Sequence, residues 1–559
     1  MEDILRIAIA EALVELEVPS SGFVVEHPGD MSHGDYATNA AFVVAKQLEQ
    51  NPRELAAKLK EKLEGKVMQV GAIEVAGPGF LNFKLRRDFF VEKIATARAL
   101  GNAWGTNTSR AGERIAFEYT SPNLFKPLHI GNLVGNIVGE SLTRLLEASG
   151  AEVKRFNYPS DIGPTVAKGV WGLMKTGGDP SNILALGEAY RVGNDAYETD
   201  EVLKKEIDEI NKKLYEGTDA ALTALREQGL RTSRARLAEL CAKLGTHFDF
   251  EIPESDAGPI GVTFVQKNLG TIFEESEGAV VYKGEKQGLH TRVFMNSKGF
   301  PTYEAKDLGN FARKLEYYPT LTQMYIVTGV EQAEYFKVLF AALREVFATV
   351  SLKELRHIPT GFLTLTTGKM SSRKGNVLTG ESLIADIEDE ARAYASTSRA
   401  KDTETLASAV AVAALKYQIL RQAVGSNIMF DKAQALSLTG DSGPYVQYTH
   451  ARTVSVQAKA RELGVTADTS RVPALPYHIE KMLYQFPEVV LRAATLLEPH
   501  RLVTYLTEVS AAFNHFYAEE RIADASDEYA PYKLALTEAT GLTLKNGLVL
   551  LGMSAPEEM

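Results

Sequence analysis

The sequence has little cysteine and no long apolar run. Cys241 is the only cysteine in 559 residues, so the chain can form neither an internal disulfide nor a thiolate zinc cluster, and we expect a reducing, cytoplasmic location. None of the 10 histidines stands at a zinc-ligand spacing such as His-x-x-x-His, which argues against a dedicated metal site. Apolar runs stay below the roughly 18 residues that a membrane helix needs, and two acids directly after Met1 argue against a leader peptide.

The standard phosphate-binding motifs are also missing, because neither a Walker A sequence nor Gly-x-Gly-x-x-Gly occurs. Basic charge is in deficit, since 61 Lys and Arg stand against 72 Asp and Glu, which makes a formal net charge of −11. This balance argues against a protein that coats nucleic acid through bulk charge. It is compatible with a local basic face that meets one folded RNA.

The length of 559 residues suggests about three or four domains. The helical and strand patterns of residues 1–108 predict a small α/β domain, which ends in the turn-rich stretch 101–112. Residues 109–395 mix strand and helix patterns, with a charged helical insertion at about 180–250. Residues 396–559 have the helical period of an all-α bundle.

The first part of the middle domain has the pattern of a doubly wound α/β fold. Arg114–Tyr119 alternates apolar and polar residues like a strand. After a loop with two prolines, apolar residues at helical spacing between Val134 and Leu146 predict a helix, and Gly150 is well placed to end it. Val153–Tyr158 predicts the next strand. A strand–loop–helix–strand unit of this kind is typical of parallel sheets.

The loop before that helix, Glu118–Asn132, is a candidate phosphate site. A helix that begins after His129-Ile-Gly points unsatisfied N–H groups and the positive end of its dipole at the loop. Gly131 lets a nucleotide approach the backbone, and Lys126 and His129 add donors. The alternative is an ordinary strand–helix loop whose histidine caps the helix.

A second candidate loop is Gly368–Gly375, in which three cations and two hydroxyls lie between two glycines. This composition is typical of a lid that closes on a polyphosphate. The alternative is a lysine-rich loop that is only solvated.

Together these loops resemble the two signatures of class I aminoacyl-tRNA synthetases, which are known as HIGH and KMSKS. His129-Ile-Gly-Asn132 matches the first signature and Lys369-Met-Ser-Ser-Arg373 matches the second. Further segments resemble the arginyl-tRNA synthetases in particular. These segments are His33–Asn39, Ser121–Gly131, Thr302–Asp307, Gly443–Arg452 and Leu544–Met559.

The resemblance implies a Rossmann-like catalytic domain of the HIGH superfamily. This domain lies between a small N-terminal α/β domain, which touches the tRNA elbow, and a C-terminal all-α anticodon-binding bundle. The implied reaction is ATP-dependent attachment of L-arginine to tRNA(Arg) through an arginyl-adenylate, with release of AMP and diphosphate. We expect ATP with Mg²⁺ as co-substrate, no tightly bound cofactor or structural metal, and a monomer, because the family is mostly monomeric.

The matched motifs imply the catalytic and ATP-binding residues. Catalytic roles fall to Lys126, His129 and Lys369. The implied ATP contacts are His129, Gly131, Asn132, Lys369, Met370, Ser371, Ser372 and Arg373. Two of these residues depart from the family pattern, because Asn132 stands where histidine is usual and Arg373 where the second signature has lysine. In this family a lysine upstream of the first signature, here Lys126, compensates for the second departure.

Arginine recognition needs a carboxylate that matches the fork of a guanidinium. The resemblance implies that the arginine-binding residues are Glu118, Asn123, His129, Tyr303, Asp307 and Gln332. Asp307 is the expected guanidinium partner, and Tyr303 lies one turn before it on the same face if the segment is helical. The alternative makes Tyr303 a core aromatic and Asp307 a helix-surface acid.

The residues that bind tRNA are less defined. Tyr445, Tyr448 and Arg452 are candidates for contacts to unpaired anticodon bases, although tyrosines on a bundle helix also serve as core residues. Two other functions are open at this point, a small-molecule adenylyltransferase of the same superfamily and a non-catalytic RNA-binding paralogue. The all-α final third disfavours the first, and the intact lysines and histidine of the motifs disfavour the second.

Overall fold

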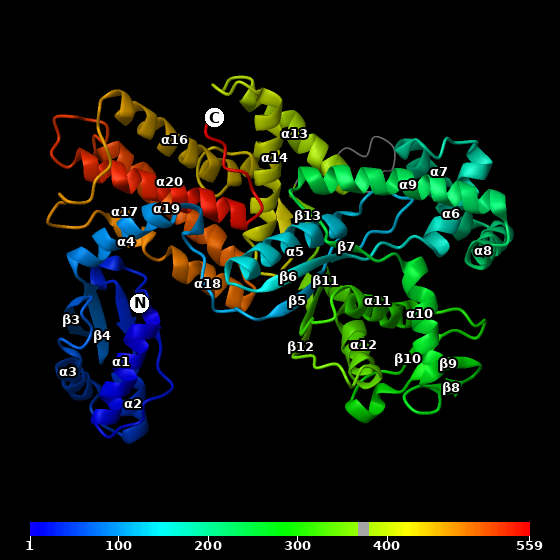
Figure 1. The fold of residues 1–559 in the computed structure, drawn as a ribbon, viewed down its shortest axis with the longest axis horizontal. Helices are drawn as coiled ribbons and strands as arrows, with labels where there is room; N and C mark the ends of the chain where they lie inside the picture. The colour runs from blue at the N-terminus through cyan, green and yellow to red at the C-terminus, as the bar shows by residue number, and fades with distance from the viewer. Residues whose placement is uncertain (367–378) are drawn as a thin grey trace. The chain divides into compact units, whose positions relative to one another are not determined.

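The computed structural model describes residues 1–366 and 379–559, which form two compact units (Figure 1). Unit 1 comprises residues 1–104, 456–486 and 512–543, and unit 2 comprises residues 105–455, 487–511 and 544–559. Within the described ranges, no helix combines the length and the apolar character that crossing a membrane requires. The candidate phosphate loop and the candidate arginine-binding residues all belong to unit 2.

Unit 1 contains a small antiparallel sheet of order β1-β2-β4-β3. Its strands are β1 (Val25–Glu26), β2 (Tyr36–Thr38), β3 (Val70–Ala76) and β4 (Phe80–Leu85). The helices that lie wholly in this unit are α1 (Glu2–Glu15), α2 (Ala40–Leu48), α3 (Pro52–Leu63), α4 (Arg87–Leu100) and α17 (His478–Leu483). A pair of side chains joins α4 to α17, because Arg87 Nη1 donates to Glu480 Oε2 at 2.6 Å. The α/β character predicted for the first hundred residues is therefore confirmed.

A parallel sheet of order β12-β11-β5-β6-β7 forms the centre of unit 2. Its strands are β5 (Arg114–Glu118), β6 (Glu152–Asn157), β7 (Phe250–Glu251), β11 (Gln323–Gly329) and β12 (Glu354–Thr360). The predicted strand–helix–strand unit is β5, α5 (Ile130–Ala148) and β6. Gly150 follows the end of α5 with φ of +93°, in the left-handed region that favours glycine after a helix.

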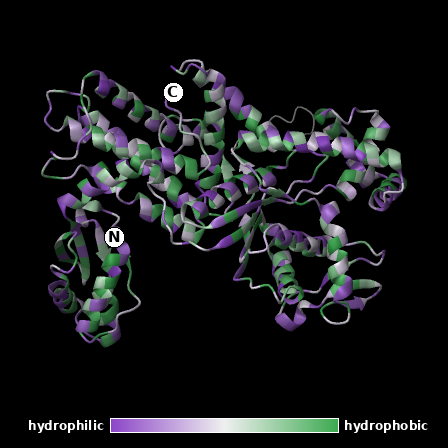
Figure 2. Cartoon of the chain, viewed as in Figure 1, coloured by the Kyte–Doolittle hydropathy of each residue, from purple (hydrophilic) through white to green (hydrophobic). Residues whose placement is uncertain are grey.

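Helices cover both faces of this sheet (Figure 1). On one face, Ala116 of β5 and Phe156 of β6 share a buried core with α10 (Glu254–Lys267), α11 (Tyr303–Tyr317) and α12 (Ala333–Val346). α5 packs on the other face, where a Cβ on Gly139 would lie 2.4 Å from the ring of Tyr119. Along the helices, hydrophobic and hydrophilic residues alternate in bands, as expected when one side of a helix is buried (Figure 2).

The connections of β5 reverse the strand order at the carboxyl end of the sheet, and the region outside the carboxyl ends of β5 and β11 is named the crevice. From β5 the chain crosses through α5 to β6 on one side, whereas β11 pairs with β5 on the other side. The strand order therefore reverses at β5, and the carboxyl ends of β5 and β11 lie side by side. In open α/β sheets, ligands bind outside such a reversal point.

The remaining elements of unit 2 surround this centre. The helical insertion predicted at about 180–250 contains α7 (Ile183–Thr199), α8 (Glu201–Glu216) and α9 (Ala220–Lys243), and α6 (Pro164–Thr176) precedes it. An antiparallel sheet consists of β8 (Glu274–Ser276), β9 (Ala279–Tyr282) and β10 (Arg292–Met295). Later helices are α13 (Gly380–Ala395), α14 (Thr403–Leu420), α15 (Lys432–Ala435) and α18 (Phe486–Leu496). The long helices α16 (Gly443–Glu462), α19 (Pro499–Glu519) and α20 (Ala530–Leu550) contribute residues to both units.

One short strand contradicts the expectation that everything after residue 395 is helical. β14 (Ile428–Phe430) pairs in parallel with β13 (Leu363–Leu365). Ile428 and Phe430 are buried while Met429 is exposed, so the strand has the usual alternation. It is too short for a periodic signal, and its hydrogen-bonding partner lies far away in the chain.

Candidate active site

The loop after β5 holds a strained backbone at the crevice. Thr120, Ser121 and Phe125 have φ values of +75°, +40° and +68°, which are costly for residues other than glycine. Two amides of α5 hold the first of them, because Asn132 Nδ2 donates to Thr120 O at 2.7 Å and Asn136 Nδ2 donates to Thr120 Oγ1 at 2.9 Å. The side chain of Asn132 thus binds the loop, so its N–H is already engaged in this structure.

The helix that follows the loop begins at Ile130, two residues before the predicted start after Gly131. His129 is the N-cap of α5, and its Nδ1 accepts a hydrogen bond from Gly131 N at 3.1 Å. The structure therefore also contains the capping contact of the alternative interpretation. His129 and Gly131 are nevertheless exposed, which leaves the helix N-terminus accessible to an anion. Partial burial and the charge of Lys126 lower the pKa of His129, so the ring is neutral at pH 7.

Lys126 lies in the same loop, and burial lowers the pKa of its amine. Its Nζ is 5.7 Å from the ring centroid of Tyr190 on α7. Lys126 and Asn123 also line a small cavity against α9, where Leu237 and Leu240 form the opposite wall. Helices α7 and α9 of the insertion therefore pack against the candidate phosphate loop.

The second motif lies outside the described residues. Lys369, Met370, Ser371, Ser372 and Arg373 all belong to the range 367–378. The residue that follows this range, Thr379, forms a bridge with His129, and Gly380 N donates to Leu128 O at 2.8 Å. The chain thus returns from the second motif directly beside the first one.

A group of buried acids and bases lies where β5 ends against α11. Glu118 is the last residue of β5 and is almost fully buried. Its Oε2 accepts hydrogen bonds from Asn310 Nδ2 at 2.8 Å and from Lys314 Nζ. A second pair joins α10 to α11, because Lys306 Nζ donates to Glu254 Oε2 at 2.6 Å. Each of these two carboxylates has its own lysine.

Asp307 lies among these groups and forms no ion pair with a lysine or arginine of the described residues. It is partly buried, and Tyr335 Oη of α12 donates to its Oδ2. Burial, followed by the negative charge of Glu118, raises the pKa of Asp307 to about 8. Asp307 is therefore no surface acid, and its ionised form has no ion-pair partner among the described residues.

The other residues predicted for arginine binding are distributed around this crevice. Tyr303 begins α11 one turn before Asp307 and is 64% exposed, so it is not a core aromatic. Gln332 is exposed and directly precedes α12, just beyond the end of β11. Asn123 forms a bridge with Ser160, which follows β6. The structure therefore gathers the predicted residues at the ends of β5, β6 and β11 and on α11.

The candidate tRNA-binding residues lie on α16. Tyr445, Tyr448 and Arg452 are spaced by three and four residues and are all half-buried, so they form one stripe. The guanidinium carbon of Arg452 lies 4.9 Å from the ring centroid of Tyr448. None of the three is a fully buried core residue.

Several residues of the crevice were missed by sequence reasoning. They are Glu254, Lys306, Asn310, Lys314 and Tyr335. Part of the signal was present, since Asn310 and Lys314 follow Asp307 at three and seven residues and thus share its helix face. The residues from α10 and α12 had no such signal, because only the packing of three helices brings them to Asp307.

Family models match three parts of the chain. The catalytic domain of class I (R) tRNA synthetases matches residues 96–432. The arginyl-tRNA synthetase N-terminal domain matches residues 3–85, and the DALR anticodon-binding domain matches residues 446–559.

Whole-chain relatives and solved structures are also similar. The arginine–tRNA ligase of Streptococcus thermophilus is 31% identical over 570 residues, which is 100% of both chains. That of Borrelia hermsii is 29% identical and covers 88% of both chains. The solved structure of Thermus thermophilus arginyl-tRNA synthetase matches with a TM-score of 0.81 and 27% identity over 100% of both chains. The Plasmodium falciparum enzyme shares the fold, with a TM-score of 0.79 over 100% of this chain and 98% of its own at 18% identity.

Proposed function

We propose how this chain, which belongs to the arginyl-tRNA synthetases of class I and attaches arginine to tRNA with ATP as substrate, performs that reaction. In the first step, the arginine carboxylate attacks the α-phosphate of ATP, a P–O bond breaks and diphosphate leaves. In the second step, the terminal adenosine of the tRNA takes the arginyl group from the adenylate and AMP leaves. Both steps take place in the crevice outside β5 and β11. The observation that carries this proposal is the carboxyl of Asp307, which is partly buried and has no lysine or arginine partner among the described residues.

ATP binds at the N-terminus of α5 in this proposal. The first step gathers negative charge on the α-phosphate and the leaving diphosphate, so positioned donors and cations are the natural catalysts. His129, Gly131 and Asn132 lie at the helix N-terminus, and Lys126 lies in the loop before it. The return of the chain at Thr379 beside His129 supports a role for Lys369, Met370, Ser371, Ser372 and Arg373 on the same phosphates. Mg²⁺ enters with ATP, bound mainly by phosphate oxygens.

Asn132 contributes to this site indirectly. Its amide donates to Thr120 O and so holds the strained loop on which the ATP phosphates are expected to lie. A histidine at this position would have a different donor geometry. The main role of Asn132 is therefore to hold the loop, and its contact with ATP is secondary.

Arginine binds with its guanidinium at Asp307. Glu118 and Glu254 are neutralised by Lys314 and Lys306, whereas Asp307 has no such partner among the described residues. A guanidinium supplies the missing charge and a fork of N–H donors. Tyr303, Gln332 and Asn123 border the same crevice, and His129 lies near the carboxylate end of the substrate in this arrangement.

tRNA binding is assigned to the two ends of the chain. The match of residues 446–559 to an anticodon-binding domain supports a role for Tyr445, Tyr448 and Arg452 in anticodon contacts, where aromatic side chains stack on unpaired bases. The N-terminal domain then contacts the tRNA elbow. We expect the protein to act as a cytoplasmic monomer, and light scattering of the purified chain tests the oligomeric state.

Asp307→Asn tests the arginine site. Asn keeps the size, but it removes the charge and places an amide N–H against the guanidinium donors. The loss of one partner of a buried charge pair typically costs ~2–5 kcal/mol, or about 30- to several thousand-fold in affinity. We therefore expect the arginine KM to rise by at least that lower factor while the ATP KM stays nearly normal.

The measurement is ATP–pyrophosphate exchange with arginine and tRNA present, repeated with lysine in place of arginine. The ratio of activity with arginine to activity with lysine is expected to fall, because a lysine ammonium cannot form the two parallel hydrogen bonds that a guanidinium forms with a carboxylate. A change of less than about threefold in the arginine KM contradicts the proposal and directs attention to Glu118. Exchange with another amino acid, and none with arginine, contradicts the substrate assignment itself.

A further inference from the structure

Tyr158 brings an unpartnered hydroxyl into the group of acids around Asp307. It directly follows β6, the strand next to β5, and its ring packs against the core shared by α10, α11 and α12. Its Oη is buried and has no hydrogen-bond partner among the described residues. Buried polar atoms are nearly always hydrogen-bonded, so this hydroxyl has a hydrogen-bonding capacity that none of the described residues uses.

The surroundings of Tyr158 define the charge of that partner. Burial and the nearby carboxyls of Asp307, Glu254 and Glu118 raise the pKa of Tyr158 well above its ordinary value, so the phenol keeps its proton. A neutral phenol can accept a hydrogen bond and donate one. Since Asp307 has no lysine or arginine partner among the described residues, a cationic donor that pairs with Asp307 also suits the hydroxyl of Tyr158 as an acceptor.

The second buried phenol at this site, Tyr335, already has a hydrogen-bond partner. Tyr335 Oη donates to Asp307 Oδ2, and Arg292 lies over the Tyr335 ring with its guanidinium carbon 5.5 Å from the centroid. Tyr335 is therefore held from both sides in the free protein. Tyr158 is the phenol whose hydrogen-bonding capacity is left for a ligand.

We infer that Tyr158 is a specificity-determining residue, whose hydroxyl accepts a hydrogen bond from the arginine guanidinium that Asp307 binds. This inference rests on the proposed arginine site at Asp307. A guanidinium has five N–H donors, and a carboxylate engages two of them side by side. Tyr158 accepts from one of the others. An ammonium substrate lacks the planar set of N–H donors that could bind the Asp307 carboxylate and the Tyr158 hydroxyl together.

Tyr158→Phe separates this role from simple packing, because it removes one oxygen and keeps the ring. If the hydroxyl binds arginine, the arginine KM rises about tenfold or more, since a hydrogen bond to a charged group contributes a factor of this order. The kcat and the ATP KM stay close to those of the wild type. Without arginine, the thermal unfolding midpoint stays the same or rises, because an unsatisfied buried hydroxyl has been removed.

The matched control is Tyr282→Phe. Tyr282 is also buried in this unit, but its Oη donates a hydrogen bond to Glu345 Oε1 at 2.8 Å. Tyr282 belongs to β9, which is not a strand of the parallel sheet. We expect this control to lower the unfolding midpoint and to leave the arginine KM unchanged. Tyr158→Phe is thus expected to weaken arginine binding without loss of stability, whereas Tyr282→Phe is expected to lower stability without an effect on arginine binding.

Three outcomes are distinguishable. If Asp307→Asn and Tyr158→Phe both raise the arginine KM, both statements stand. If Asp307→Asn raises it and Tyr158→Phe leaves it within twofold, the arginine site stands and the hydroxyl of Tyr158 serves only a bound water, which overturns the inference. If Asp307→Asn has no effect, the proposed site fails, and the role of Tyr158 fails with it.

Discussion

Asp307 controls the charge balance of the crevice at the scale of single residues. Burial and Glu118 raise its pKa to about 8, well above the ordinary aspartate value of ~3.9. Near pH 7 the free site therefore holds a proton at Asp307. A guanidinium stays charged at any ordinary pH, so arginine pairs with Asp307 only after that proton leaves.

This proton release predicts how arginine binding depends on pH. Between pH 6 and 8 the affinity rises with pH, by at most about tenfold per unit, because the proton competes with the guanidinium below the raised pKa. Calorimetric titration with arginine, in buffers of different ionisation enthalpy, measures the affinity and the proton released. Asp307→Asn is expected to abolish both the slope and the release. A wild-type affinity that is constant over this range contradicts a protonated Asp307.

At the scale of elements, the position of Asp307 depends on how closely α10 and α11 approach each other. A Cβ on Gly261 of α10 would lie 1.7 Å from Ala305 O of α11, and a Cβ on Gly309 would lie 1.9 Å from Ala257 O. The two backbones therefore touch at both crossing points. Any side chain there moves α11, and α11 carries Tyr303 and Asp307.

Gly261→Ala tests this contact. Overpacking typically costs about 1–3 kcal/mol of unfolding free energy, and the shift of α11 is expected to raise the arginine KM more than the ATP KM. The control is Gly258→Ala on the same helix, because its Cβ would meet its nearest atoms at an ordinary 3.9 Å and alanine favours a helix over glycine. Urea unfolding and substrate kinetics of both variants provide the comparison. Equal effects of the two substitutions contradict the close-contact argument.

At the scale of the whole molecule, two basic side chains, Lys416 and Arg144, join distant parts of unit 2. Lys416 of α14 donates to Leu244 O, at the end of α9, and to Gly552 O, just after α20, both at 2.7 Å. Helix C-termini carry partial negative charge, which attracts cations. Gly552 has a φ of +71°, in the left-handed region that favours glycine, and a Cβ there would lie 2.5 Å from Lys416 Nζ.

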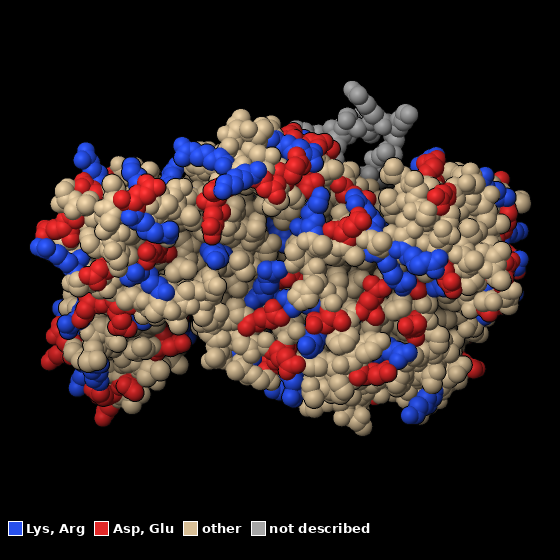
Figure 3. All heavy atoms as spheres, turned by 45° about the horizontal axis from the view of Figure 1, so that its top comes forward, with Lys and Arg blue, Asp and Glu red and all other residues tan. Residues whose placement is uncertain are grey.

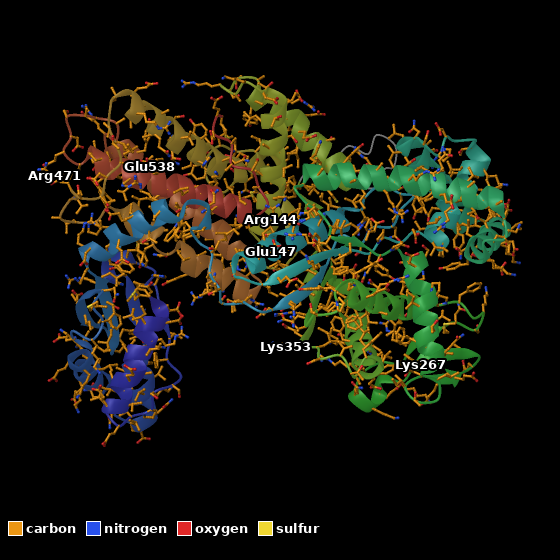
Figure 4. The ribbon with its side chains drawn as sticks, in the orientation of Figure 1. Arg144, Glu147, Lys267, Lys353, Arg471 and Glu538 are labelled. Atoms are coloured by element: carbon orange, nitrogen blue, oxygen red, sulfur yellow. The ribbon has the colours of Figure 1, made fainter. Side chains whose placement is uncertain are left out.

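Arg144 joins the same elements to α5. It donates to Gly245 O at 2.7 Å and Val549 O at 3.0 Å, and to Glu140 at 2.7 Å. Figure 4 shows Arg144 and Glu147 on the C-terminal half of α5. The helix whose N-terminus is assigned to ATP is thus tied at its other end to the insertion and to the last helix of the chain.

Lys416 predicts a pH dependence of stability. Burial lowers its pKa to about 7, whereas the unfolded chain keeps the lysine proton up to about pH 10. The unfolded state thus binds one more proton in this window, so raising the pH stabilises the folded state by up to about 1.4 kcal/mol per unit. The neutral amine still has two N–H groups for its two carbonyls.

Lys416→Met isolates this contribution. Between pH 7 and 9, the wild type is expected to gain unfolding free energy relative to the variant in chemical denaturation. A difference that does not change with pH would mean that Lys416 stays charged, with the two helix C-termini and Glu140 compensating its charge.

Surface charge at this scale bears on the tRNA. Over the face drawn in Figure 3, basic and acidic residues are interspersed, as the net charge of −11 suggests. On that face, tRNA binding must therefore use selected residues and not a broad field of one sign.

Local sequence patterns account for the features that depend on neighbouring residues. The order of β5, α5 and β6, the capping of α5 by His129 and the cap of α3 at Asn51 follow from side-chain period and turn chemistry within a few residues. The arginyl-tRNA synthetase motifs likewise consist of contiguous residues. Family and reaction could therefore be predicted from the amino-acid sequence alone.

The pairing of buried charges, in contrast, depends on contacts between residues that are far apart in the chain. Glu118 is neutralised by Lys314, 196 residues later, and Asp307 is oriented by Tyr335 of another helix. β14 forms because its partner β13 lies beside it. No local pattern encodes such pairings, because they depend on which backbones touch, as α10 and α11 do through their glycines. For the same reason the unpartnered hydroxyl of Tyr158 becomes visible only in the folded protein.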